Sequence, residues 1–225
     1  SVILDLSERK QAEKRIQDAL TQKDLLLREV HHRVKNNLQV IHSLLDLQAL
    51  KIKDPDLVAM LRDSQNRIRS MSMIHQTLYQ SHDFAQVDFQ QFLGELMPNL
   101  MDSYGMVTGH VAMVIEANQV KLPINEAIPC GLIVNELVSN ALKHGFPSGQ
   151  RGTVRVLMRQ DDNHHIELAI SNDGLGIPEH QNLERSGSLG LQLVQLLTRQ
   201  LHGRLDVQRS GPTCFTLRFP LERKT

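Results

Sequence analysis

The stretch LLLREVHHRVKNNLQVIHSLLDLQAL, residues 25–50, predicts a long helix and decides how the N-terminal part of the chain folds. Apolar or ambivalent residues recur at helical spacing, at positions 27, 31, 34, 38, 41 and 45. We expect this stripe to face a partner helix. His31 lies on the stripe, whereas His32 is rotated about 100° from it, at the edge of that face or in solvent. Taken alone, the pair also fits two ordinary surface histidines.

The helix should begin near Ser7, a suitable N-cap, because no proline or glycine interrupts the following residues up to Leu50. Apolar residues follow a near-heptad spacing in its first part, at 12, 16, 19 or 20 and 26 or 27. This favours a parallel coiled coil between two chains over a single surface helix. The opening SVILDL is typical of a strand that closes a preceding domain, so we expect an upstream domain.

Asp54 and Pro55 should end this helix and begin a second one that runs to Tyr79. Two helices joined by a short turn form an antiparallel hairpin with one exposed apolar face. Two such hairpins can bury that face in a four-helix bundle, so we expect a homodimer. Residues 81–87 predict a turn and a domain boundary.

The rest of the chain alternates helices and strands. We expect helices at 88–103, 124–144 and 189–202, and strands at 110–117, 152–159, 165–171, 204–209 and 213–219. Mixed helices and strands with antiparallel hairpins predict an α+β fold, a two-layer α/β sandwich.

The composition excludes several classes of protein. Among 225 residues, 25 Lys plus Arg balance 25 Asp plus Glu, which argues against binding to nucleic acid or to anionic membranes. Apolar runs are far shorter than the roughly 20 residues that a bilayer requires. Cys130 and Cys214 lie in apolar surroundings without a C-x-x-C neighbour, which argues against disulfides and zinc. We expect a soluble, cytoplasmic segment without membrane contact.

Three segments point to chemistry, and NELVSNALKHGFP, residues 135–147, is the first. On a helix, Glu136, Asn140 and Lys143 or His144 share one side. Such a stripe can hold a hydrated Mg²⁺ and a polyphosphate, because Mg²⁺ takes few protein oxygens and keeps several waters. The pattern alone also fits an amphipathic surface helix.

The second segment is SNDGLGIPE, residues 171–179. Asp173 follows a strand whose even-numbered residues face a core, and its carboxylate could accept a hydrogen bond from an amino group such as that of adenine. Gly174 and Gly176 allow the backbone to approach a flat ligand closely. An ordinary N-D-G hairpin turn is the alternative.

The third segment is SGSLGLQLVQLLTRQLHG, residues 186–203. Ser186, Gly187, Ser188 and Gly190 precede or open an apolar helix. Free backbone N–H groups and the positive helix end are then available to phosphate oxygens. Glycine-rich helix starts are common, so this segment is specific only together with the other two.

In this order and spacing, the three segments resemble the nucleotide-binding module of the ATPase superfamily that includes histidine kinases, Hsp90, DNA gyrase B and the mismatch-repair ATPases, the GHKL or Bergerat type. NELVSNALKH is similar to its N box, DGLGIP and GSLGLQLV to its two glycine boxes, and GPTCFTLRFP to its closing hairpin. EVHHRVKNNLQ resembles the phosphoacceptor motif of the histidine kinases related to the HWE kinases, and LDLSERKQAE the exit of a PAS sensor domain. The resemblance covers nearly the whole chain.

This resemblance implies a sensor histidine kinase core that uses ATP and Mg²⁺. It implies the end of a PAS-type sensor and a linker at 1–22, a dimerising phosphotransfer hairpin at 23–82 and a catalytic ATP-binding domain at 83–225. Asn140 would bind Mg²⁺, Glu136 would act near the attacking imidazole, and Asp173 would read adenine. The remaining nucleotide contacts would come from Lys143, His144, Gly174, Gly176, Gly187, Ser188, Leu189, Gly190 and Thr213. The stretch 177–186 is short and lacks Phe, unlike the lid of many histidine kinases, and Pro212 is unusual in the closing turn.

His32 is the expected phosphoacceptor, because it precedes Arg33 in the motif and His31 occupies the core-facing stripe. The phosphoryl group would then pass to an aspartate of a response regulator. Asn36 lies one turn after His32 and could orient water for dephosphorylation of that partner. Two alternatives stay open: a dimeric scaffold with a weak or degenerate nucleotide site, and an anti-sigma-type kinase that binds ATP without histidine phosphorylation.

Overall fold

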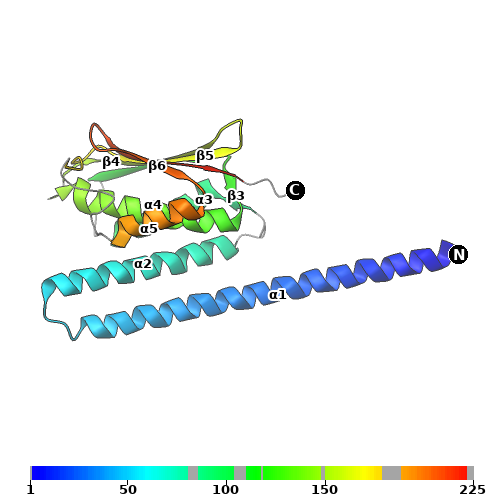
Figure 1. The fold of residues 1–225 in the computed structure, drawn as a ribbon. Coiled ribbons are helices and arrows are strands. Elements are labelled where there is room, and N and C mark those ends of the chain that lie inside the picture. The colour runs from blue at the N-terminus through cyan, green and yellow to red at the C-terminus, as the bar shows by residue number, and fades with distance from the viewer. Residues whose placement is uncertain are drawn as a thin grey trace.

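The computed structural model describes residues 2–80, 86–103, 110–117, 119–147, 150–178 and 189–221. Two long helices precede a domain of mixed helices and strands (Figure 1). In chain order the elements are α1 (Val2–Ala49), α2 (Pro55–Gln80), β1 (Val87–Asp88), α3 (Phe89–Ser103), β2 (Val111–Glu116), β3 (Lys121–Leu122), α4 (Ile124–Asn140), the π-helical turn η1 (Ala141–Gly145), β4 (Gly152–Gln160), β5 (His165–Asn172), α5 (Leu189–Gln200), β6 (Arg204–Gln208) and β7 (Thr213–Pro220).

Helices α1 and α2 form an antiparallel hairpin, and α1 extends well past the end of α2 (Figure 1). Asp54 Oδ1 accepts a hydrogen bond from the backbone N of Leu57 at 3.4 Å, which caps α2 just ahead of Pro55. Gln65 Nε2 donates to Asp46 Oδ1 across the hairpin at 3.0 Å. Among the described residues, every helix is either too short or too polar to span a lipid bilayer.

The expected strand at the start of the chain is wrong, because residues 2–6 already belong to α1. A strand needs a hydrogen-bonded neighbour. Neither sheet in the described part of the chain includes these residues; they form the first turn of α1, where their C=O groups accept hydrogen bonds from the following turn.

Five strands form the main sheet, in the order β2-β4-β5-β7-β6. Strands β2 and β4 pair in parallel, and the other neighbours pair antiparallel. In β5 the even-numbered residues Ile166, Leu168 and Ile170 are buried, as their alternation predicts.

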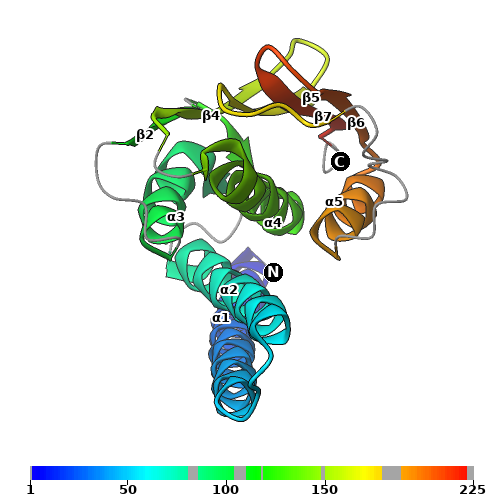
Figure 2. The same ribbon diagram turned by 90° about the vertical axis from the view of Figure 1, so that its left-hand side faces the viewer.

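Helices α3, α4 and α5 cover one face of this sheet (Figures 1 and 2). The core lies between the two layers, where the largest fully buried side chains are Phe89, Phe92, Leu93, Met97, Leu122, Ile133, Leu137, Leu142, Ile166 and Phe219. The predicted α+β two-layer sandwich is confirmed.

Two details were not predicted. Strands β1 and β3 pair in a separate two-stranded ladder, with Val87 opposite Leu122. Both strands have only two residues, too few for an alternation pattern to be visible. In addition, the helix expected at 124–144 is α-helical only to Asn140 and ends as the π-helical η1. Such π-helical segments are rare in proteins, and those that do occur often lie at functional sites.

The hairpin and the α/β domain meet through α2, which packs against α3 and α4 on the side away from the sheet (Figure 2). Helix α4 is therefore enclosed between the sheet and α2, and most of its residues from Ala127 to Ser139 are buried.

Candidate functional site

The end of α4 carries the carboxylate and the amide that the sequence singles out. Glu136 is buried and Asn140 is half-buried, whereas His144 in η1 is exposed. Lys143 is half-buried and turns toward α2. Of the two alternatives at this position, Lys143 therefore shares the α2-facing side of the helix with Glu136.

Two ion pairs join α2 to this helix. Arg67 Nε donates to Glu136 Oε1 at 2.7 Å, and Lys143 Nζ donates to Asp63 Oδ1 at 2.5 Å. The first pair is sheltered from water, since only 20% of the Arg67 side chain and 4% of the Glu136 side chain are exposed. The carboxylate that was expected near an attacking imidazole is thus bound to an arginine of α2.

Gly190, near the start of α5, leaves the space that this pair fills. A Cβ atom at Gly190 would overlap Glu136 Oε2 and would lie 2.9 Å from Arg67 Nη2. Elements α2, α4 and α5 therefore converge on one point at which only glycine fits without displacement. The expected role of Gly190 at a nucleotide stays a prediction, but its role in this packing is visible.

At the end of β5, the structure favours Asn172 over Asp173 as the polar side chain that faces the helical layer. Asn172 continues the buried face of the strand and is 6% exposed, and its Nδ2 has no hydrogen-bond partner. Asp173 is exposed, and its Oδ1 accepts a hydrogen bond from the backbone N of Thr153 on β4 at 2.6 Å. Asp173 as the adenine reader stays a prediction, but its carboxylate already has a partner outside the helical layer.

The glycines that follow bring the backbone close to other parts of the protein. A Cβ at Gly174 would overlap the carbonyl oxygen of Gly145, and one at Gly176 would lie 2.8 Å from that of Arg209. Leu175 N donates to Gly145 O at 2.8 Å, and Ile177 N donates to Arg209 O at 2.8 Å. The loop therefore links η1 to the β6–β7 turn and is not a simple N-D-G hairpin.

Thr213 belongs to the same neighbourhood, because it is the register partner of Asn172 on β7. It is 4% exposed, and its hydroxyl donates to Arg209 O at 3.1 Å. Pro212 precedes it in a turn where the Gly211–Pro212 peptide bond is cis and Gly211 has a φ of 63°. The structure thus gathers Asn172, Thr213 and Gly145 at one end of the sheet.

The remaining predicted site residues lie partly outside the described structure. His31 and His32 belong to the backbone of α1, but their side chains lie outside the described part, as do Gly187, Ser188 and most of the stretch 177–186. Asn36 on α1 and Leu189 on α5 are exposed.

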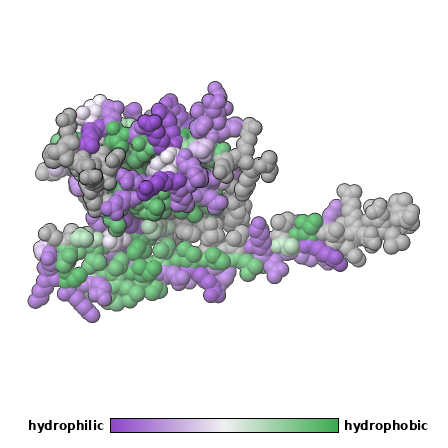
Figure 3. Space-filling view, in the orientation of Figure 1, coloured by the Kyte–Doolittle hydropathy of each residue, from purple (hydrophilic) through white to green (hydrophobic). Residues whose placement is uncertain are grey.

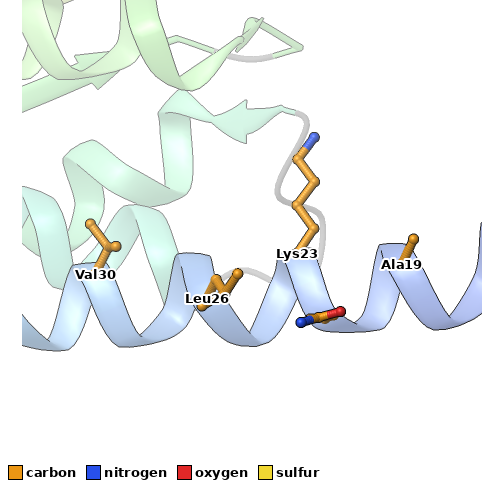
Figure 4. Close-up of a pocket in the computed structure, with 5 residues that line it drawn as sticks. Ala19, Lys23, Leu26 and Val30 are labelled. Atoms are coloured by element: carbon orange, nitrogen blue, oxygen red, sulfur yellow. The ribbon is translucent and has the colours of Figure 1, made fainter.

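The described helices line two hollows at the protein surface. One lies on the projecting part of α1 and is lined by Ala19, Gln22, Lys23, Leu26 and Val30 (Figure 4). Because a single helix lines it, it offers no converging polar groups for a ligand. The other, about 620 Å³, lies between α2 and α5 beside Arg67 and separates the two helices.

Sequence reasoning missed Asp63, Arg67 and Asn172. The signal for Asn172 was available, since the alternation through Ile166, Leu168 and Ile170 places it on the buried face. No comparable signal identifies Arg67, because its partner Glu136 is 69 residues away along the chain.

Comparison with known proteins agrees with this architecture. Residues 29–104 match the family described as histidine kinase. Residues 125–223 match the family described as histidine kinase-, DNA gyrase B- and HSP90-like ATPase. The two matches follow one another along the chain in the order of the hairpin and the α/β domain.

Curated relatives of this chain include sensor histidine kinases. It is 34% identical over 219 residues to the sensor histidine kinase PdtaS of Mycobacterium tuberculosis H37Rv, an alignment that covers 94% of this chain and 42% of PdtaS. It is 28% identical over 211 residues to the blue-light-activated histidine kinase 2 of Erythrobacter litoralis, covering 92% and 60%. The chain therefore spans less than two thirds of the length of these relatives.

A solved structure shares the fold. The histidine kinase domain of the Erythrobacter litoralis EL346 blue-light activated histidine kinase aligns with a TM-score of 0.63 and 27% identity, covering 89% of this chain and 96% of that one. With a histidine kinase helical region followed by an ATPase domain, this chain belongs to the histidine kinase family.

Proposed function

We propose that this chain is the core of a two-component sensor histidine kinase, which phosphorylates its own His32 from ATP and passes the phosphoryl group to an aspartate of a response regulator. One observation carries the proposal: a histidine-bearing hairpin and an ATPase domain occur in one chain, and helix α4, which carries Glu136, lies against that hairpin. The presence of the hairpin and the ATPase domain in one chain disfavours an anti-sigma-type kinase, which has no need of the hairpin.

We place the nucleotide base at the ends of β5 and η1. The buried Nδ2 of Asn172 lacks a partner, and an unpaired buried donor costs free energy until it meets an acceptor. An amide can accept a hydrogen bond from the exocyclic amino group of adenine and donate one to a ring nitrogen. We therefore propose Asn172 as a base-reading residue, in addition to the predicted Asp173.

The half-buried Asn140 fits a magnesium ligand, because it lies one helical turn beyond Glu136 and its side chain ends in an amide oxygen. Bound Mg²⁺ supplies charge neutralisation at the γ-phosphate. The chain's own part is then to position the imidazole and to hold its proton. Glu136, once released from Arg67, can accept the N–H proton of His32 while the other ring nitrogen forms the P–N bond and the bond to the ADP oxygen breaks.

An ordinary imidazole titrates near pH 6.5, so about half or more is neutral and nucleophilic at physiological pH. We favour His32 over His31 as the phosphoacceptor, because His32 lies at the edge of the apolar helix face. Asn36, exposed one turn later, remains our candidate for orienting a water molecule during dephosphorylation of the response regulator.

We also propose a homodimer through the hairpin. Large apolar side chains are exposed along α1 and α2, namely Val40, Ile41, Leu44, Leu47, Leu50, Leu57 and Met60. Figure 3 shows an apolar band over these two helices. Pairing with a second hairpin would remove this band from water. A PAS-type sensor joined to residues 1–22 and a cytoplasmic location complete the proposal.

The deciding experiment is incubation with Mg²⁺ and γ-labelled ATP, comparing wild type, His31→Ala and His32→Ala. We expect label that is stable in base, labile in acid and absent only from His32→Ala. Label retained in His32→Ala would reject His32 as the acceptor. Absence of label in wild type, with ATP binding shown by a thermal shift, would count against the kinase function and favour the scaffold.

A further inference from the structure

The order of acidic and basic residues along α2 and along α4 fixes how the ATPase domain is aligned on the hairpin. Along α2, the acidic Asp63 precedes the basic Arg67; along α4 and η1, the acidic Glu136 precedes the basic Lys143. Acid and base therefore pair at both points. A shift of one helix along the other would set Arg67 toward Lys143 or Asp63 toward Glu136, and such like-charge contacts are repulsive. The ATPase domain is thus held at one place on the hairpin.

That place is far from the phosphoacceptor. Gln65 on α2 lies against Asp46 on α1, and the helices run antiparallel. The level of His32 is therefore near the end of α2, about 12 residues beyond Arg67, or roughly 18 Å at 1.5 Å per residue. In a dimer whose two-fold axis runs along the bundle, the second histidine lies at the same level. Glu136 can reach neither histidine from this position.

The burial of the Arg67–Glu136 pair favours the docked arrangement. Glu136 is 4% exposed, so its carboxylate depends on Arg67 for its charge to be balanced. Gly190 of α5 leaves room for both side chains. A groove of about 620 Å³ separates α5 from α2 beside Arg67. Helices α2 and α5 therefore do not pack closely along the groove, and the Arg67–Glu136 pair is the sheltered part of this junction.

We infer that Arg67 is a positioning residue that withdraws Glu136 from the reaction. While the pair is formed, the ATPase domain is docked on α2 in an inactive arrangement, and phosphorylation of His32 requires the pair to open. The inference rests on the proposed kinase function. It makes α2 both a part of the phosphotransfer hairpin and the surface that restrains the enzyme.

The test compares Arg67→Met with the control Arg69→Met, which changes an exposed arginine on the same helix. Without Arg67, the docked state contains a buried, unpaired carboxylate, so the population shifts to the undocked state. We expect faster amide hydrogen exchange at residues 60–71 and an autophosphorylation rate that rises on the order of tenfold. The affinity for ATP should not change. Arg69→Met should behave as wild type in all three measurements.

A charge-reversal cycle at the second pair keeps the inference testable if Arg67→Met does not fold. Asp63→Lys and Lys143→Asp should each accelerate exchange at residues 60–71, and the double variant should restore slow exchange. Failure of the double variant to restore it would overturn the inference.

The kinetic outcomes separate the two proposals. A wild-type enzyme that labels normally while Arg67→Met labels at the same rate or more slowly would overturn the positioning role alone. Absence of label from wild type and Arg67→Met alike, with ATP bound, would reject the kinase function and the inference with it.

Discussion

Arg67 Nε on α2 lies 2.7 Å from Glu136 Oε1 on α4, and this hydrogen bond spans the junction between the hairpin and the ATPase domain. The bond is sheltered by Gly190, where a side chain would collide with both partners. The bond connects Arg67, which belongs to none of the sequence motifs, to Glu136, the carboxylate of the segment 135–147.

Gly190→Ala should destabilise the ATP-free protein by about 1–3 kcal/mol, because the new methyl group overpacks the Arg67–Glu136 pair. Gly94→Ala is the matched control: no atom lies within 4 Å of its Cβ position in α3. That substitution should stabilise the helix by about 0.5–1 kcal/mol. Urea unfolding without nucleotide measures both. Equal stability of Gly190→Ala and wild type would contradict the packing argument.

Asn172→Leu should separate binding from stability. The substitution removes a buried amide whose Nδ2 is unpaired, at similar volume, so the melting temperature without ATP should stay the same or rise. The affinity for ATP should fall about tenfold if the amide reads the base. Asp173→Ala should also lower the affinity for ATP, but by less than Asn172→Leu, because the Asp173 carboxylate already accepts a hydrogen bond from the backbone N of Thr153. Calorimetric titration measures both affinities, and a larger loss in Asp173→Ala than in Asn172→Leu would contradict the ranking and make Asp173 the main base reader.

Glu167 should make stability depend on pH. It accepts hydrogen bonds from Arg218 Nε at 2.7 Å and Arg159 Nε at 2.8 Å, and the bond from Arg218 is the main reason why its pKa lies below the ordinary value of 4.5. A pKa lowered by folding means that the carboxylate stabilises the protein above pH 4.5, and that this contribution is lost as the pH falls through the folded-state pKa.

Glu167→Gln should therefore lower the free energy of unfolding by about 1 kcal/mol at pH 7 and should have little effect once wild-type Glu167 is protonated. Glu95→Gln, which removes a carboxylate at an exposed position of α3, is the matched control. A constant difference between Glu167→Gln and wild type from pH 7 to pH 3 would show that the pKa is not shifted.

Leu44→Glu and Leu47→Glu should weaken the proposed dimer. These side chains are 56% and 58% exposed in the single chain, and a charge at a buried bundle position would lack a partner. Sedimentation equilibrium should show a dissociation constant raised by about tenfold or more. Gln48→Glu adds the same charge at an exposed polar position of α1 and should leave the dimer intact. Unchanged association of both leucine variants would argue against this interface.

Much of the fold follows from local patterns in the sequence. The alternation in residues 165–171 and the apolar faces of the predicted helices decide which side chains point inward, because a strand repeats every two residues and a helix every 3.6. The boundaries of α2, α3 and β4 accordingly agree with the predictions to within one residue. The same local patterns placed Glu136 and Asn140 together on one helix.

What the sequence could not determine was decided by tertiary packing. Whether Lys143 or His144 meets α2 depends on the π-helical end of α4, and Asp173 turns toward Thr153 only because β4 lies beside it. The Arg67–Glu136 pair forms because α2 packs on α4. The spacing of residues along the chain specifies which side chains share one face of a helix or strand. It does not specify which other helix or strand packs against that face. The sequence by itself therefore determined most of the helices and strands, the fold class and the family, and only the tertiary structure decided what restrains Glu136.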